Sequence, residues 1–107
     1  MSEKRIRQIE HRIERIKEAL NHIGPMRPGS LTRQYKDRQN KTGAYWQISY
    51  TRQMKSRTEY VRGEMVAQVR RQIAMYKRFK RLIDQWIDLD IERSKLTIQM
   101  AKWATTQ

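Results

Sequence analysis

Basic and aromatic side chains are interleaved in the middle of this chain, in a pattern that suits contact with a polyanion. The basic ones, on or beside three expected strands, are Arg27, Arg33, Lys36, Arg38, Lys41, Arg52, Lys55 and Arg57. The aromatic ones are Tyr35, Tyr45, Trp46, Tyr50 and Tyr60. Lysine and arginine neutralise phosphates and release counterions, which supplies the dominant, salt-sensitive part of nucleic-acid affinity. Exposed rings on a sheet can stack unpaired bases, and a β-ribbon can enter a major groove.

The same residues would also fit a solvated basic surface over an ordinary core. Trp46 and Tyr50 share a strand face with Ile48, which favours a core role for these two rings. For Arg33, Arg52, Lys55 and Arg57 the charge distribution favours nucleic-acid contact. Residues 25–62 carry nine basic and two acidic residues, an excess of +7, against +2 in residues 1–24 and +4 in residues 63–107.

A second basic stripe lies on the expected C-terminal helix. Arg70, Lys77 and Arg81 follow at i, i+7 and i+11, so they share one helical face of about 16 Å, enough to follow a few phosphates. Such a stripe could equally keep a coiled coil soluble, or pair with acidic residues of the N-terminal helix. Those acidic residues are Glu10, Glu14 and Glu18. Both interpretations stay open.

No residue set predicts catalysis, a metal or another cofactor. Asp84, Asp88 and Glu92 share a helical face, but two-metal catalysis needs carboxylates that converge from different elements. The two histidines, His11 and His22, are about 16 Å apart along a helix, too far for one metal. With no cysteine and no glycine-rich phosphate loop, the sequence predicts a protein that is not an enzyme.

The elements that would position the basic residues follow from periodicity. Over residues 1–24, isoleucines and a leucine recur at spacings of three and four, the a/d pattern of a coiled-coil seam, and Gly24-Pro25 ends the helix. The seam residues are Ile6, Ile9, Ile13, Ile16, Leu20 and Ile23. Three heptads are too few to be stable alone, so this helix must pack on another element.

A three-stranded antiparallel sheet is predicted over residues 25–62. Alternating patterns give strands at 30–36, 44–52 and 55–61, the last two joined by a tight turn at Gln53-Met54. A helix is predicted over residues 63–103, about 60 Å long. It would either break near Asp88-Leu89-Asp90 or meet another chain with its second half. The expected fold is therefore a single α+β domain, residues 1–107, with coiled-coil-like pairing of its helices.

Composition narrows the functional classes further. The chain has 107 residues, 24 basic and 11 acidic, and hence a formal charge of +13, while only 37% of its residues are apolar. A large enzyme pocket is not expected in so small and polar a chain. The segment Met1-Ser2-Glu3-Lys4-Arg5 does not look like a signal peptide, and no run is long enough to span a membrane. The expectation is a cytoplasmic protein without a membrane partner.

The order of several short motifs resembles an uncharacterised family of small bacterial domains. The motifs here are Arg27-Pro28-Gly29-Ser30-Leu31, Gly43-Ala44-Tyr45-Trp46, Arg57-Thr58-Glu59-Tyr60-Val61, Met65-Val66, Val69-Arg70 and Tyr76-Lys77-Arg78-Phe79. Members of the family typically read Gly-Ser-Leu, Gly-Pro-Tyr-Tyr, Arg-Tyr-Val and then a helix. The likeness covers about residues 26–83. The family is often encoded on transposons, plasmids or phages, so the resemblance implies a mobile-element setting.

The sequence departs from this family at one place that bears on metal binding. Many members carry a cysteine cluster between the first two strands, suggestive of a zinc knuckle. Here the segment Tyr35-Lys36-Asp37-Arg38-Gln39-Asn40-Lys41-Thr42 has no cysteine. A zinc site is therefore not carried over to this chain.

Together these patterns predict a non-enzymatic nucleic-acid-binding accessory protein for a transposase or recombinase, with DNA favoured over RNA. In this hypothesis the sheet grips the sugar-phosphate backbone, while the isoleucine seam with Trp86 and Trp103 forms a homodimer or binds a recombinase-type partner. The main alternative is a protein-interaction subunit of a larger nucleoprotein complex. RNA binding is a third possibility, favoured if Tyr35 and Tyr45 are exposed, because base stacking suits single strands.

Overall fold

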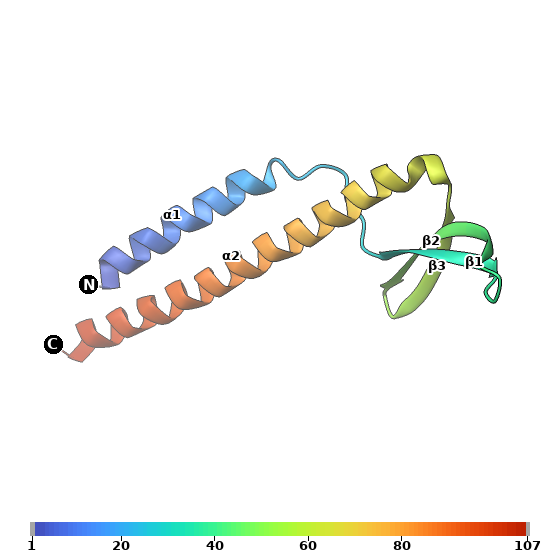
Figure 1. Cartoon of the computed structure of the whole chain (residues 1–107). Coiled ribbons are helices and arrows are strands. Elements are labelled where there is room, and N and C mark those ends of the chain that lie inside the picture. The colour runs from blue at the N-terminus through green and yellow to red at the C-terminus, as the bar shows by residue number, and fades with distance from the viewer. Residues whose placement is uncertain (1, 107) are drawn as a thin grey trace. The chain divides into compact units, whose positions relative to one another are not determined.

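The structure is a computed structural model of the chain, and it describes residues 2–106 (Figure 1). In chain order it has helix α1 (Ser2–Leu20), strands β1 (Ser30–Asp37), β2 (Thr42–Arg52) and β3 (Lys55–Val61), a 3-10 turn (Gly63–Met65) and helix α2 (Val66–Thr106). The predicted α+β fold is confirmed: an N-terminal helix, a three-stranded antiparallel sheet and a long C-terminal helix.

The described residues form two compact units. The helical unit comprises residues 2–23 and 79–106, and the sheet unit comprises residues 24–78. Helix α2 contributes its first residues to the sheet unit and the remainder to the helical unit. That the whole chain is one domain therefore stays a prediction.

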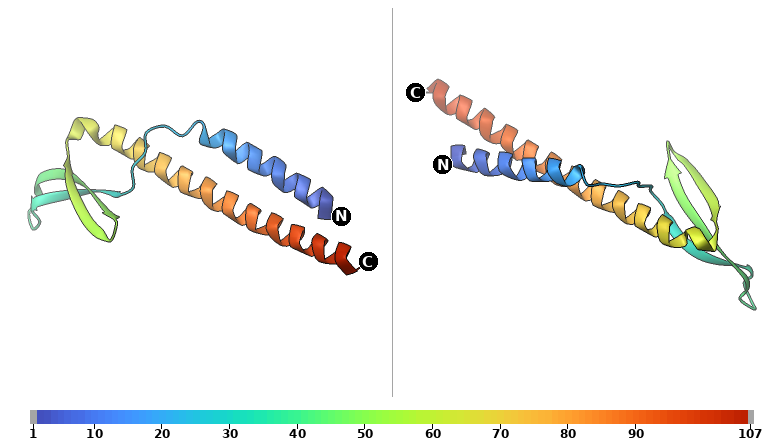
Figure 2. Two further views of the ribbon diagram at one scale, coloured as in Figure 1. Left: turned by 180° about the vertical axis from the view of Figure 1, so that it is seen from behind. Right: turned by 90° about the horizontal axis from the view of Figure 1, so that it is seen from above.

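In the helical unit, α1 runs antiparallel to residues 79–106 of α2 (Figure 2). The middle of the predicted seam, Ile9, Ile13 and Ile16, is buried together with Leu89 of α2. Leu20, Leu82, Trp86 and Leu96 pack against this cluster. Because Leu82, Leu89 and Leu96 are seven residues apart, they lie on one face of α2, opposite the isoleucine seam. Burying each isoleucine stabilises the pair by about 1.5–3 kcal/mol.

Helix α2 is continuous, with 41 residues from Val66 to Thr106. The break considered near Asp88-Leu89-Asp90 does not occur, because Leu89 is buried under α1 while Asp88 points to solvent. The other alternative placed a second chain on this half of the helix. In the structure, α1 of the same chain packs on this half of the helix, and contact with another chain stays a prediction.

In the sheet unit, the three strands pair antiparallel in the order β1-β2-β3, and the predicted strand bounds hold to within two residues. Leu31 lies opposite Ile48, and Trp46 lies opposite Val61. One sheet face packs on the first part of α2. The core there consists of Ile48, Val61, Val69 and Ile73, with Leu31, Trp46 and Val66 packed against it.

The two hairpin turns are built differently. Gln53 and Met54 both have positive φ, 54° and 64°, as a two-residue type I′ turn requires, although they lack the Asn-Gly sequence that favours it. In the β1–β2 turn, the Asp37 carboxylate accepts hydrogen bonds from the backbone N–H groups of Gln39 and Asn40, at 3.1 and 3.2 Å. The Asn40 side-chain amide donates to it as well, at 2.9 Å. The Asp37 carboxylate thus organises the β1–β2 turn.

Gly29 has a steric role at the start of β1. Its φ is +142°, and an added Cβ would lie 2.7 Å from Cγ1 of Ile48, which is fully buried. Only glycine lets the backbone pass so close to this core residue. The glycine of the Arg-Pro-Gly-Ser-Leu motif is therefore explained by packing in this chain.

Candidate nucleic-acid interface

The strand register separates the side chains of the sheet onto two faces. The inner face, which packs on α2, carries Leu31, Ile48 and Val61 at its centre. By alternation it also carries charged residues that extend beyond the core: Arg33, Arg52, Lys55, Arg57 and Glu59. The opposite, outer face carries the alternate positions, which are hydroxyl, amide and phenol side chains with a single charge at Lys36.

One group of predicted phosphate contacts gathers at the β2–β3 turn. Arg52 lies directly opposite Lys55, and Arg57 lies opposite Tyr50. All three basic side chains belong to exposed residues, and none forms an ion pair within residues 2–106. Like charges placed opposite each other in a sheet are destabilising, so this turn holds a local excess of positive charge that the chain does not relieve.

A second group lies at the β1–β2 turn, at the other end of β2. Lys36, Arg38 and Lys41 are all exposed, and they too lack an ion pair in the part of the chain that the structure describes. The stem of Lys36 lies against Gly43, where an added Cβ would be 3.0 Å from the lysine Cβ. Six of the eight predicted basic residues of this segment are thus brought together as two groups, one at each end of the middle strand, and Arg27 and Arg33 belong to neither group.

Arg27 is engaged inside the chain rather than displayed to a ligand. Its guanidinium forms an ion pair with Glu59 at 3.3 Å and lies 5.2 Å from the centroid of the Tyr50 ring. The Tyr50 hydroxyl donates to the same carboxylate at 2.8 Å. These hydrogen bonds, from Tyr50 first and then Arg27, lower the pKa of Glu59, and the bond to Glu59 raises the pKa of Tyr50. A phosphate contact by Arg27 would require this network to open.

Every acidic side chain of the sheet unit has a partner. Asp37 holds the β1–β2 turn, Glu59 is bound by Arg27 and Tyr50, and Glu64 pairs with Arg62 at 3.1 Å. Residues 24–78 contain thirteen basic and three acidic residues, an excess of +10, whereas the rest of the chain has eleven and eight. Glu59 and Glu64 are in ion pairs and Asp37 is held by neutral donors, so the basic residues of the sheet unit exceed its internal counter-ions by ten.

The predicted stripe on α2 is divided between the two units. Arg70 lies over the Trp46 ring at 5.2 Å, and Arg70 and Lys77 line a shallow groove beside Gly29 and Leu31. Arg81 belongs to the helical unit instead. The alternative in which the stripe pairs with acidic residues of α1 is not observed among the described residues, whose only ion pair on an α1 glutamate joins Glu14 to Lys17.

The aromatic side chains differ in how accessible they are. Trp46 packs against the core, as predicted, whereas Tyr50 is half-buried in the polar network with Glu59. Tyr35 and Tyr45 are half-buried, and the Arg33 guanidinium lies 5.9 Å from the Tyr35 ring. Tyr60 is 69% exposed. The condition that would have favoured RNA, exposure of Tyr35 and Tyr45, is therefore not met.

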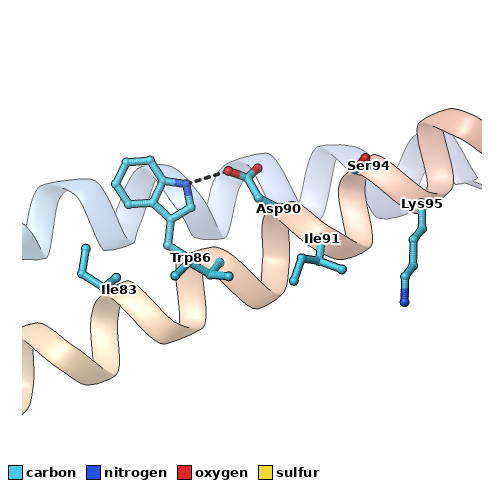
Figure 3. A pocket seen from close by; sticks show the side chains of 7 residues that line it. Ile83, Trp86, Asp90, Ile91, Ser94 and Lys95 are labelled. Carbon is cyan, nitrogen blue, oxygen red and sulfur yellow. Dashed lines mark hydrogen bonds between the residues drawn. The ribbon is translucent and has the colours of Figure 1, made fainter.

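A different surface lies in the helical unit. An apolar groove on α2 is lined by Ile83, Trp86 and Ile91 (Figure 3), together with Ile87. The Ile87 side chain remains 51% exposed. The Trp86 indole N–H donates to Asp90 at 3.0 Å, which fixes the ring at the groove. Of the residues that line this groove, only Trp86 is among the predicted interface residues, which otherwise are the seam in residues 6–23 and Trp103.

The predicted interface residues are thus in different environments. Ile9, Ile13 and Ile16 are buried in the chain's own core, so a partner could reach them only if the helix pair opened. Ile6, Leu20 and Ile23 are half-buried, and Trp103 is 68% exposed. The seam predicted as an interface is, at its centre, a folding core of this chain.

The acidic residues considered for metal chemistry are not gathered into a site. Asp84 and Asp88 are exposed, while Glu92 is bound by Arg5 in a two-point ion pair, with Nε–Oε2 at 2.6 Å and NH2–Oε1 at 2.9 Å. Residues 2–106 contain no group of three or more histidine, aspartate or glutamate side chains placed to hold a metal ion. No helix in this range is long and apolar enough to cross a membrane.

Comparisons with known proteins do not assign the chain to a group. No protein-family model matches it, and neither the curated proteins nor the solved structures yield a match. The proposed function therefore rests on the geometry and charge described above.

Proposed function

We propose that this protein is a non-enzymatic DNA-binding accessory protein, which grips the duplex backbone with the sheet unit. The observation that carries the proposal is the unrelieved charge of this unit: an excess of +10, with all three of its acidic side chains already bound within the chain. A folded unit with this charge lowers its self-repulsion by binding a polyanion, and counterions released from the phosphates favour binding further.

The arrangement of the cations favours contacts with DNA phosphates at fixed positions over diffuse electrostatic attraction. The two groups, Arg52, Lys55 and Arg57 at one end of β2 and Lys36, Arg38 and Lys41 at the other, are held by hairpin turns with fixed geometry. The strand between them has 11 residues, which at about 3.3 Å each can separate phosphate contacts by roughly one turn of B-DNA.

Duplex DNA is favoured over single-stranded RNA by the state of the aromatic rings. Recognition of single strands depends on aromatic faces on which unpaired bases stack. Tyr35 and Tyr45 are half-buried and the ring of Trp46 is covered by Arg70, so Tyr60, at 69% exposure, is a single ring without a second exposed ring beside it. The role in transposition or recombination rests on the resemblance of residues 26–83 to the mobile-element family, and is proposed on that ground.

The test is fluorescence anisotropy of labelled duplex DNA and single-stranded RNA over a salt series. We expect the logarithm of affinity to fall with the logarithm of salt concentration, at a slope equivalent to several phosphates. The variant Arg52→Glu/Lys55→Glu/Arg57→Glu should lose about tenfold or more in affinity for duplex DNA, and its slope should fall by about three.

A matched control changes the net charge equally in the other unit. Arg7, Arg12 and Arg15 of α1 are exposed and form no ion pair among the described residues. Their triple replacement by glutamate should leave the salt slope unchanged. Equal losses in both variants would show that net charge alone drives binding, and salt-independent binding would contradict the proposal.

The second candidate function is a protein-interaction subunit of a nucleoprotein complex, and the apolar groove at Trp86 favours it (Figure 3). The anisotropy experiment with duplex DNA distinguishes the two candidate functions. If the wild-type chain does not bind duplex DNA at about 100 mM salt, partner binding through α2 becomes the better explanation. In that case a pull-down should capture the same partner with the Arg52, Lys55 and Arg57 variant as with the wild type.

A further inference from the structure

The outer face of the sheet is built from uncharged polar side chains in register across all three strands. Ser30 lies beside Ser49, which lies beside Thr58, and the next row is Thr32, Gln47 and Tyr60. A third row pairs Gln34 with Tyr45. In a chain where 33% of the residues are charged, these three rows contain no charged and no aliphatic side chain. Such a face is neither a general electrostatic surface nor a hydrophobic docking site.

Several hydrogen-bonding groups on this face remain available to a ligand. Some hydroxyls pair across strands, Ser49 with Thr58 at 3.4 Å and Thr51 with Ser56 at 3.2 Å. The Gln34 amide donates to Thr32 at 3.2 Å. By contrast, the side chains of Tyr45, Gln47 and Tyr60 form no hydrogen bond within residues 2–106. The outer face therefore keeps hydrogen-bond donors and acceptors at Tyr45, Gln47 and Tyr60 that a ligand can use.

We infer that this outer face reads base edges in the major groove of duplex DNA, an inference that rests on the proposed DNA binding. Three strands at spacings of about 4.8 Å give a backbone about 10 Å across, which fits a groove about 12 Å wide. Glutamine can bond bidentately to adenine, and serine or threonine hydroxyls can donate to or accept from either purine. The side chains of the three rows are of the types that this readout uses.

The position of the charges supports the same placement. At one end of the outer face, Lys36 and the turn residues Arg38 and Lys41 would meet phosphates, whereas Arg52, Lys55 and Arg57, at the other end of β2, are on the inner face by alternation. The uncharged rows lie between the two turns. Phosphate contacts set the register of a protein on DNA and carry no sequence information, whereas base contacts supply specificity. Phosphate contacts would therefore be made at the turns, and base contacts at the centre of the outer face.

The inference is tested by selecting duplexes from a random-sequence pool with the full chain, and then comparing a selected duplex with a scrambled one. We expect the wild type to prefer the selected duplex by at least about tenfold. Gln34→Ala/Gln47→Ala should abolish that preference, with the affinity for scrambled DNA and the salt slope unchanged. A second variant, Thr58→Val, keeps the branched shape on an exposed position and removes one hydroxyl, so it should weaken the preference without altering the fold.

The control is Gln8→Ala/Gln85→Ala, which removes two exposed glutamine side chains of the helical unit and should keep the full preference. Three results overturn the inference. If the wild type binds all duplexes equally with strong salt dependence, base reading fails and the proposed DNA binding stands. If it does not bind duplex DNA, both fail together. If the Gln34 and Gln47 variant keeps the wild-type preference while folded, the readout lies on another surface.

Discussion

The two units of this protein use the same helix, α2, but they leave opposite kinds of surface to solvent. In the helical unit, Arg5 binds Glu92 and Arg93 binds Asp90, and an apolar groove on α2 remains open. In the sheet unit, the acidic side chains are bound within the chain, the cations of both turns form no ion pair among residues 2–106, and the open face is polar with a single charge at Lys36.

This difference shows that the two units are distinguished by the balance of basic against acidic residues, and not by the number of basic residues alone. Both units are rich in lysine and arginine, with eleven basic residues in one and thirteen in the other. The helical unit has eight acidic residues to offset them, whereas the sheet unit has three. The expected site of DNA binding is therefore the unit with the larger residual charge, and the expected site of protein contact is the unit with the apolar groove.

The largest difference in DNA binding between the two units is expected when a cavity is created in each core. Ile48 and Ile9 are both completely buried, one in the sheet unit and one in the helical unit, so truncation to alanine should cost about 2–5 kcal/mol in each case. We expect Ile48→Ala to abolish DNA binding and Ile9→Ala to preserve most of it. Urea denaturation followed by circular dichroism, together with anisotropy at low temperature, measures both quantities. Equal loss of DNA binding in the two variants would contradict the assignment to the sheet unit.

A smaller effect is expected from a methyl group added at Gly29. The new Cβ would lie 2.7 Å from Ile48, on a backbone with φ of +142°, so Gly29→Ala should lower the free energy of unfolding by about 1–3 kcal/mol and weaken DNA binding at elevated temperature. Gly63→Ala is the matched control, because nothing lies within 4 Å of its added Cβ. It should leave stability unchanged within about 0.5 kcal/mol. Thermal denaturation compares the two, and an equal effect of both would show that Gly29 is not constrained by packing.

The sequence predicted the elements well because each has a strong local signal. The spacing of the α1 isoleucines and the alternation around Ile48 identify helix and strands without tertiary information. The pairing of α1 with the C-terminal helix was predicted, but the face of α2 that α1 covers was not, because the leucines of α2 at seven-residue spacing are mixed with exposed isoleucines such as Ile87. A local reading cannot tell which of two apolar stripes another helix will cover.

The candidate site was predicted less completely, because it depends on contacts distant in the chain. The basic turn residues were identified from composition, but the pairing of Arg27 with Glu59 joins positions 32 residues apart. The outer face was overlooked because its side chains are individually unremarkable in a sequence. Strict alternation of Thr32 and Gln34, and of Tyr45 and Gln47, was a signal that could have revealed it once the register was known.

The smallest predicted effect concerns the two long-range ion pairs, one in each unit, and it depends on pH. The hydrogen bond from Arg5 lowers the pKa of Glu92, and those from Tyr50 and Arg27 lower the pKa of Glu59. Because each carboxyl is more acidic in the folded state, its contribution is present above the unfolded pKa of about 4.5 and is lost as the pH falls through the folded pKa.

We therefore expect Glu92→Gln and Glu59→Gln to lower the midpoint of thermal unfolding slightly at pH 7, and to converge on the wild type in acid. Both carboxylates are solvent-accessible, so added salt should diminish the difference in the midpoint of thermal unfolding.

The two variants should also differ from each other in DNA binding. Glu59→Gln releases Arg27 and adds a free cation to the sheet unit, so it should strengthen DNA binding, whereas Glu92→Gln frees Arg5 in the helical unit and should leave it unchanged. Equal gains in DNA affinity for both variants would show that a freed arginine strengthens DNA binding equally in either unit.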